Sequence, residues 1–159
     1  MDIRSGAKYP AGALSNFASH PFEFDGVACS SMEGLLQSLK SPDEEEQREI
    51  CGLVGITAKK RGQDMPHLKI HTLYWKGVEI DRFSEAYQEF LDRAFDALSE
   101  NEAFAKALLL TGDEKLKHSV GKMDEKETIL TRREFSSRLT KIRERLKAER
   151  DEIVNNLIN

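Results

Sequence analysis

The sequence predicts a helix-rich α+β domain with a small β-sheet and a long C-terminal helix. Apolar residues recur with helical periodicity over residues 83–98 and again over residues 131–157. Only residues 22–29 and 68–74 have the composition of strands. With 159 residues, of which 39% are hydrophobic, the chain is long enough for one ordinary core. We expect one domain over residues 1–147 and a charged helical extension over residues 148–159.

Composition narrows the function classes. The formal net charge is −4, whereas sequence-independent duplex binding needs an electropositive surface. The chain contains no apolar run of the ~18 residues that a membrane span requires, and its first residues lack an apolar signal core. Two cysteines are too few for a disulfide framework. We therefore expect a cytoplasmic protein with no membrane partner.

Near the N-terminus, Ser15 and Asn16 are suited either to capping a turn or to hydrogen-bonding a ligand. Phe17 fits a core position or a stacking surface for a base. Residues 22–29 then form two short apolar stretches around Asp25-Gly26, a pair typical of tight hairpin turns. The sequence predicts a β-hairpin here.

Residues 32–40 form the first predicted helix, with Ser30 or Ser31 as its N-cap. Its apolar face has the spacing i, i+3, i+4 and i+7 and comprises Met32, Leu35, Leu36 and Leu39. A second stripe has the spacing i, i+4 and i+7 and comprises Glu33, Gln37 and Lys40. That stripe is either a solvated polar face or a binding surface.

Two further helices follow. Ser41-Pro42 has the residue types of an N-cap and first helical position, and an acidic first turn comes after it at residues 43–46. Thr57 is predicted to cap a short helix over residues 58–62, ending at a glycine. The basic residues of that helix either face a phosphate or end the helix in solvent; they are Lys59, Lys60 and Arg61.

His67 and His71 have the four-residue spacing that places two imidazoles on one helix face for a metal. Pro66 precedes them, and no third ligand follows at a recognisable offset. We therefore expect no metal site and no cofactor.

The second half of the chain is predicted to be helical. Residues 83–98 form a core scaffold, residues 102–110 form a helix that breaks at Thr111-Gly112, and Thr131 and Glu134 form a capping box for the last helix. Beyond Lys147 this helix is highly charged with isolated Ile and Leu residues. It either frays or pairs with a partner, which allows a homo-oligomer.

Several of these motifs together resemble the YbiA-like family, also called NADAR. The matching elements, in order, are Leu14-Ser-Asn-Phe17, Pro21-Phe22, Asp25-Gly26 and the helical set Glu33, Gln37 and Lys40. A leucine-rich helix followed by Thr111-Gly112 and Leu116 is also similar to that family. The resemblance implies a helix-rich α+β fold and N-glycosidase chemistry on ribose-based substrates. Those substrates are riboflavin-pathway intermediates or ADP-ribosylated guanine.

The chain departs from the family pattern in two places. Gly34 occupies the position of a histidine that follows the glutamate in the family, and residues 118–131 lack the family's Trp-Gly loop. A divergent site would then use His118 with Asp124 or Glu127. The family's tryptophan corresponds to Trp75, which the resemblance places in the ligand pocket. The alternative for this residue is packing in the core.

Cleavage of a ribose N-glycosidic bond passes through an oxocarbenium-like state that a carboxylate stabilises while an acid assists departure of the base. We predict Glu33 and Asp124 as catalytic residues. The predicted substrate-binding residues are Ser15, Asn16, Phe17, Gln37, Lys40, Arg61, Trp75 and His118. The expected partner is a ribose-containing nucleotide, free or as ADP-ribosylated nucleic acid. The alternatives are a non-catalytic ADP-ribose or nucleotide-binding module and an interaction protein that uses its C-terminal helix.

Overall fold

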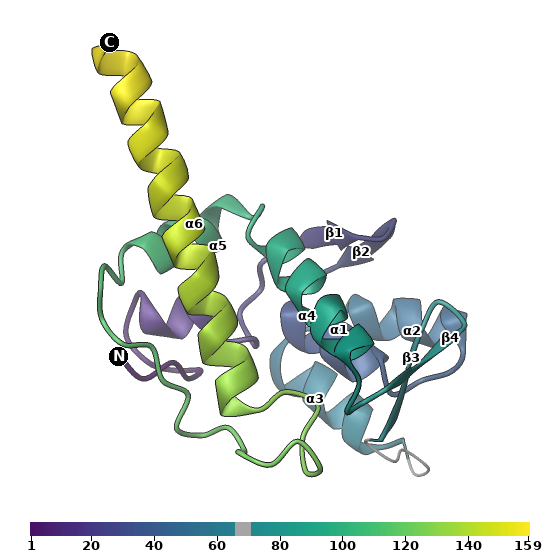
Figure 1. The fold of residues 1–159 in the computed structure, drawn as a ribbon. Coiled ribbons are helices and arrows are strands. Elements are labelled where there is room, and N and C mark those ends of the chain that lie inside the picture. Colours follow the sequence, from purple (N-terminus) through teal and green to yellow (C-terminus); the bar gives the residue numbers. More distant parts are fainter. Residues whose placement is uncertain (66–70) are drawn as a thin grey trace.

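The computed structural model describes residues 1–65 and 71–159, and these residues confirm the α+β class (Figure 1). The helices are a short 3₁₀ helix (Ala11–Leu14), α1 (Met32–Ser38), α2 (Glu44–Cys51), α3 (Gly55–Gln63), α4 (Glu85–Leu98), α5 (Glu102–Leu109) and α6 (Arg132–Ile158). The strands are β1 (Phe22–Phe24), β2 (Val27–Cys29), β3 (Thr72–Trp75) and β4 (Val78–Asp81).

The strands form two separate antiparallel hairpins. β1 pairs with β2, and Asp25 and Gly26 adopt φ values of 49° and 78° at the turn, as the Asp-Gly pair predicts. β3 pairs with β4 around Lys76-Gly77, which has the same left-handed geometry. β4 was not predicted, because its apolar-polar alternation is only four residues long, from Val78 to Asp81, and its side chains are mostly exposed. Part of the predicted strand at 68–74, and His67, lie outside the described residues.

The helix starts agree with the sequence at three places and differ at three. Ser31 caps α1 by accepting a hydrogen bond from the Gly34 N–H, and α5 and α6 begin as expected. The helix predicted from Phe83 begins only at Glu85, with Ser84 as its N-cap. The predicted start of α2 at Ser41-Pro42 is wrong, because Asp43 is the N-cap and the Ser41 hydroxyl accepts from the Asp43 N–H. The predicted cap at Thr57 is also wrong, since α3 already begins at Gly55.

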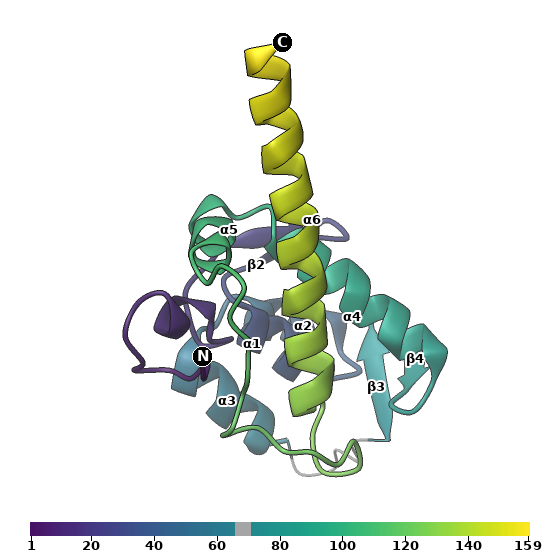
Figure 2. The ribbon, with the colours of Figure 1, turned by 60° about the vertical axis from the view of Figure 1, so that its left-hand side comes forward.

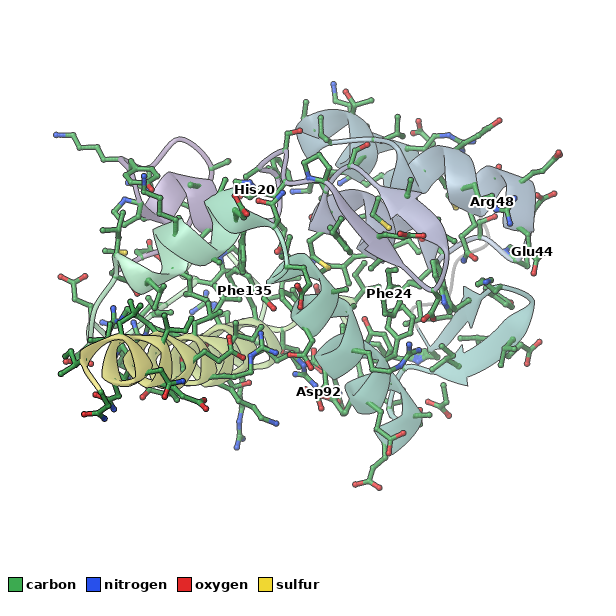
Figure 3. All side chains as sticks on the ribbon, turned by 90° about the horizontal axis from the view of Figure 1, so that it is seen from above. His20, Phe24, Glu44, Arg48, Asp92 and Phe135 are labelled. Carbon is green, nitrogen blue, oxygen red and sulfur yellow. The ribbon has the colours of Figure 1, made fainter. Side chains whose placement is uncertain are left out.

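The core is built around α4. Its buried face packs against the β1–β2 hairpin on one side and against α6 on the other, so that Phe24 lies 5.3 Å from Phe90 and Phe95 lies 6.1 Å from Phe135, between ring centroids. Figure 3 shows Phe24 and Phe135 pointing into the interior from the two sides. α1 packs against α2 and α3. This arrangement fixes one face of α1 in the core and leaves the Glu33 face for another surface.

The last helix leaves the body of the molecule. Its first half is anchored by Phe135, Leu139 and Ile142, which are buried, whereas residues 148–159 are all exposed. Figures 1 and 2 show this end projecting away from the other elements. Among the described residues, no helix is long and apolar enough to cross a membrane.

Candidate functional site

A cavity of about 600 Å³ lies between the N-terminal segment, α1, α3 and the loop that leads to α6. Figure 2 shows the N-terminal segment, α3 and this loop arranged around α1. The residues that line the cavity are Arg4, Ser5, Ser15, Asn16, Phe17, Glu33, Leu36, Gln37, Lys40, Lys59, Gln63, His118, Val120, Gly121, Lys122, Glu127, Thr128, Ile129 and Leu130. Seven of the ten predicted site residues are in this set.

The polar stripe of α1, with Lys40 in the turn just after the helix, forms the floor of the cavity. Glu33, Gln37 and Lys40 all line it, so the stripe faces the cavity and is more than a solvated helix face. The Gln37 Nε2 donates a hydrogen bond of 2.8 Å to Glu33 Oε1, and Gln37 is only 7% exposed. A buried amide therefore holds the carboxylate in one orientation.

The charges on this floor influence one another. Burial raises the pKa of the Glu33 carboxyl above its ordinary value, although the hydrogen bond from Gln37 and the charges of Lys59 and Lys40 act to lower it. Burial also lowers the pKa of Lys40, and the charge of Glu33 opposes that shift. A carboxylate with a raised pKa is a better proton acceptor than an exposed one.

Gly62 lets α3 approach this floor closely. A Cβ atom at Gly62 would overlap the amide oxygen of Gln37. That oxygen is buried and has no hydrogen-bond partner among the described residues. Its packing against the glycine directs the amide nitrogen of Gln37 toward Glu33.

The segment Ser15–Phe17 forms the adjoining wall. The Ser15 Oγ accepts a hydrogen bond of 3.2 Å from the Phe17 N–H, so Ser15 caps a turn while it also lines the cavity. The Asn16 carbonyl accepts from the Glu33 N–H at 3.1 Å, which ties the segment to the first turn of α1. The turn and the ligand interpretations of Ser15-Asn16 are therefore compatible.

His118 lies in the loop wall opposite α1. Its Nδ1 hydrogen-bonds the main-chain oxygen of Ile3 at 2.7 Å, and its ring packs edge-on to Phe135 at 4.9 Å between centroids. The next residue, Ser119, donates from its N–H and its hydroxyl to the carboxylate of Asp2. The N-terminal segment thus holds the loop and also brings Arg4 to the cavity.

Three predicted site residues do not line this cavity. Arg61 is two residues from Lys59 on α3, so it points toward α2 and pairs with Glu46 at 3.3 Å. Trp75 is buried against Phe24 and Phe90, and its Nε1 donates to Asp25 in the exposed turn of the first hairpin at 2.8 Å. Asp124 is exposed, and its carboxylate accepts from the Lys126 N–H at 2.9 Å.

A buried network fixes the loop end of the cavity. The Arg82 Nε donates to the Thr128 carbonyl at 2.9 Å, and its two terminal nitrogens donate to Glu134 at 3.0 and 2.6 Å. Tyr87 donates from its hydroxyl to the Ile129 carbonyl. Thr128, Ile129 and the following turn are therefore positioned by β4, α4 and α6 together.

The cavity is more positive than the chain as a whole. Four cationic side chains line it, against two carboxylates, in a chain of net charge −4; they are Arg4, Lys40, Lys59 and Lys122. Arg61, Arg93 and Arg145 each pair with carboxylates elsewhere, whereas these four form no ion pair within the part of the chain that the structure describes. Such a surface suits an anionic ligand.

Sequence reasoning found the α1 stripe and His118 but missed Arg4, Ser5, Gln63 and Lys122. These residues carry no motif, and only the tertiary fold brings them to the cavity. In residues 1–65 and 71–159, no group of three or more His, Cys, Asp or Glu residues is arranged to hold a metal ion.

The family model for bacteriophage protein GP30.3 matches residues 8–144. This chain belongs to that family. This chain is 38% identical over 149 residues to an uncharacterized 17.1 kDa protein from the Gp30–rIII intergenic region of Enterobacteria phage T4. The match covers 92% of this chain and 98% of the phage protein.

This chain is also similar in structure to the E. coli protein YbiA. The TM-score is 0.62 at 21% sequence identity, with 96% of this chain and 87% of YbiA covered. This similarity confirms the predicted YbiA-like fold.

Proposed function

We propose that this protein is an N-glycosidase that hydrolyses a ribose N-glycosidic bond in a phosphate-bearing nucleotide. The observation that supports this most directly is the Glu33 carboxylate, held by Gln37 on the floor of a cavity that is lined by four cationic side chains. The substrate classes that fit the resemblance are ADP-ribosylated guanine and riboflavin-pathway intermediates. Both combine a ribose, an N-glycosidic bond and phosphate.

Each group on the cavity floor has a distinct role in the proposed reaction. Glu33 lies near the anomeric carbon, where it stabilises the positive charge of the oxocarbenium-like state or accepts a proton from the attacking water. Gln37 orients the carboxylate by its hydrogen bond. Lys40, Lys59, Arg4 and Lys122 bind the phosphate oxygens.

The test is turnover by the wild-type protein and by Glu33→Gln. The purified protein is incubated with ADP-ribosylated guanine in an oligonucleotide or with phosphorylated riboflavin-pathway intermediates, and the released sugar and base are separated by chromatography. We expect Glu33→Gln to lower kcat by a factor of about 100 or more, because general-base and electrostatic catalysis contribute on that order. Binding of ADP-ribose, measured by calorimetry, is expected to change much less.

Two controls make the result specific. Glu23→Gln removes the same charge from an exposed position on β1 and is expected to leave turnover unchanged. Glu33→Gln itself is expected to be at least as stable as the wild type at neutral pH. The pKa of the Glu33 carboxyl is raised in the fold, so the ionised carboxylate is less stable there than in the unfolded chain. Replacing it with a neutral amide removes this destabilisation.

ADP-ribose binding without turnover of any of these substrates would instead support a nucleotide-binding module. One observation favours that alternative, namely that Gly34 stands where the resembling family has a histidine beside its glutamate. A Cβ at this position would come within 2.6 Å of the Leu53 carbonyl oxygen and 2.8 Å of the Ile50 carbonyl oxygen. No imidazole can therefore enter the cavity from this point of α1 unless α2 moves.

A further inference from the structure

The proposed hydrolysis needs a proton donor for the departing base, and the sequence predicts Asp124 as the second acid or base beside Glu33. Asp124 is exposed and does not line the cavity. One imidazole and one carboxyl of the same loop do line it, those of His118 and Glu127. The side chain of His118 is held by contacts on several sides, whereas Glu127 is exposed.

The hydrogen bond to Ile3 determines which imidazole nitrogen can exchange a proton. A main-chain carbonyl only accepts hydrogen bonds, so Nδ1 of His118 carries a hydrogen in both charge states of the ring. Nε2 is then the nitrogen that gains and loses a proton. It makes no hydrogen bond with the described residues, and the ring lines the cavity.

The ring is also fixed in position. The edge of His118 packs on Phe135, and a Cβ at Gly121 would come within 2.5 Å of His118 Cδ2, so the backbone of the loop lies directly against the imidazole. A short parallel bridge joins Asp2 to Lys117, and the Ile3 N–H donates to the Lys117 carbonyl at 2.8 Å. The first residues of the chain therefore brace the segment that carries His118.

We propose that His118 is the general acid of the hydrolysis, delivering a proton from Nε2 to the nitrogen of the leaving base. The inference rests on the proposed N-glycosidase function. As the bond between C1′ and the base nitrogen breaks, its electron pair stays on the base, and that nitrogen takes the proton from His118. Water adds to C1′ and gives its proton to Glu33. The base leaves protonated and the sugar keeps a hydroxyl, and solvent then returns the proton from Glu33 to His118.

Charged groups from every neighbouring element act on the His118 ring. The anionic groups around it are Glu33 on α1, Asp2 in the N-terminal segment and Glu127 in the loop. The cationic groups are Arg4, Lys40, Lys59 and Lys122, which line the same cavity, and Arg132 at the start of α6, whose Cγ lies beside Gly121.

The test compares His118→Asn with the wild type. The Asn side-chain nitrogen replaces Nδ1, so it keeps the donor to the Ile3 carbonyl and removes the titrating Nε2. We expect kcat to fall by a factor of about 100, with little change in KM, and we expect the decline of kcat with rising pH to disappear. His20→Gln is the matched control, because it keeps the Nε2 donor to the Ala13 carbonyl at a position outside the cavity.

A second substrate separates acid catalysis from a structural role. In a nucleotide whose base is a pyridinium, the base leaves as a neutral pyridine and needs no proton. His118→Asn is therefore expected to hydrolyse this substrate at nearly the wild-type rate. The inference is overturned if His118→Asn keeps the wild-type kcat and pH profile, or if it loses both substrates equally. If the wild type itself has no turnover, the proposed function fails and this inference fails with it. Loss of turnover in Glu33→Gln but not in His118→Asn overturns only the inference.

Discussion

Gly34 and Gly62 both lie where α1 meets a neighbouring helix, yet they constrain the site in different ways. At Gly34, the atoms that a Cβ would meet are the backbone oxygens of Ile50, Cys51 and Leu53 near the end of α2, which cannot move individually. At Gly62, the atom in the way belongs to the side chain of Gln37, which can rotate. A methyl group therefore strains the fold at Gly34 and displaces a site residue at Gly62.

We expect Gly62→Ala to reduce turnover more than stability. The added methyl group pushes the Gln37 amide away and removes its 2.8 Å hydrogen bond to Glu33, so the carboxylate loses its fixed orientation. A loss of about tenfold in kcat follows if this orientation is worth the ~1.4 kcal/mol that tenfold represents. Steady-state kinetics and thermal unfolding on the same preparation check the prediction.

Gly34→Ala is the comparison variant. We expect it to lower the free energy of unfolding by about 1–3 kcal/mol, as overpacking against fixed backbone does. If Gly62→Ala keeps full turnover, Gln37 has no orienting role toward Glu33. If Gly34→Ala is as stable as the wild type, α2 is free to move away from α1.

At the scale of elements, a buried charged network holds the loop before α6 on the side away from the cavity. Arg82 is fully buried and makes a bidentate pair with Glu134, which also accepts hydrogen bonds from Gln88 and the Thr131 N–H. Burial alone would raise the pKa of Glu134, but the hydrogen bonds from Arg82, Thr131 and Gln88 outweigh it and hold that pKa below its ordinary value. The pair joins the end of β4 to α6 across the loop.

We expect Arg82→Met to lower the free energy of unfolding by about 3–5 kcal/mol at neutral pH, because it leaves the Glu134 charge buried without its partner. The pH dependence changes as well. A carboxyl whose pKa is depressed in the fold stabilises the protein above its unfolded pKa of about 4.3, and this contribution is lost as the pH falls through the lower folded value. Denaturant unfolding between pH 3 and 7 is therefore expected to show a smaller loss of stability on acidification in Arg82→Met than in the wild type. An equal loss in both proteins would show that Glu134 does not depend on Arg82.

The sequence predicts those elements and site residues whose signals are local. The hairpin at Asp25-Gly26, the caps at Ser31 and Thr131 and the polar stripe of α1 depend on residues a few positions apart, and the structure contains all of them. β4 gives only a four-residue alternation, because it is short and mostly exposed and its position depends on pairing with β3.

The remainder of the site depends on contacts between distant parts of the chain. Arg4 reaches the cavity because the N-terminal segment pairs with residues 115–119, more than 100 positions away. The prediction for Arg61 rests on its charge and that for Trp75 on the family resemblance, but helix phase directs Arg61 toward Glu46, and Trp75 packs in the core and donates to Asp25. Local pattern cannot show which side of a helix a neighbouring helix covers.

At the scale of the whole molecule, the end of α6 is separate from the site. Residues 148–159 are all exposed, and among them Ile153, Val154, Leu157 and Ile158 are 61%, 46%, 82% and 76% exposed. They recur at i, i+1, i+4 and i+5 and so form one apolar stripe on the projecting helix. An isolated helix of this length is marginal in water, and an apolar stripe on it is suited to packing against a second helix.

We expect truncation after Lys147 to leave the domain intact and to remove self-association. Because residues 148–159 bury no side chain against the body, the midpoint of thermal unfolding at low protein concentration and the affinity for ADP-ribose are expected to be unchanged. Light scattering over a range of concentrations is expected to show oligomers for the full chain and monomers for residues 1–147. Ile153→Glu combined with Leu157→Glu provides a control of full length, since it charges the stripe while keeping the chain. A full chain that stays monomeric at high concentration would contradict the prediction, and a truncated chain that unfolds earlier would show that the extension stabilises the domain itself.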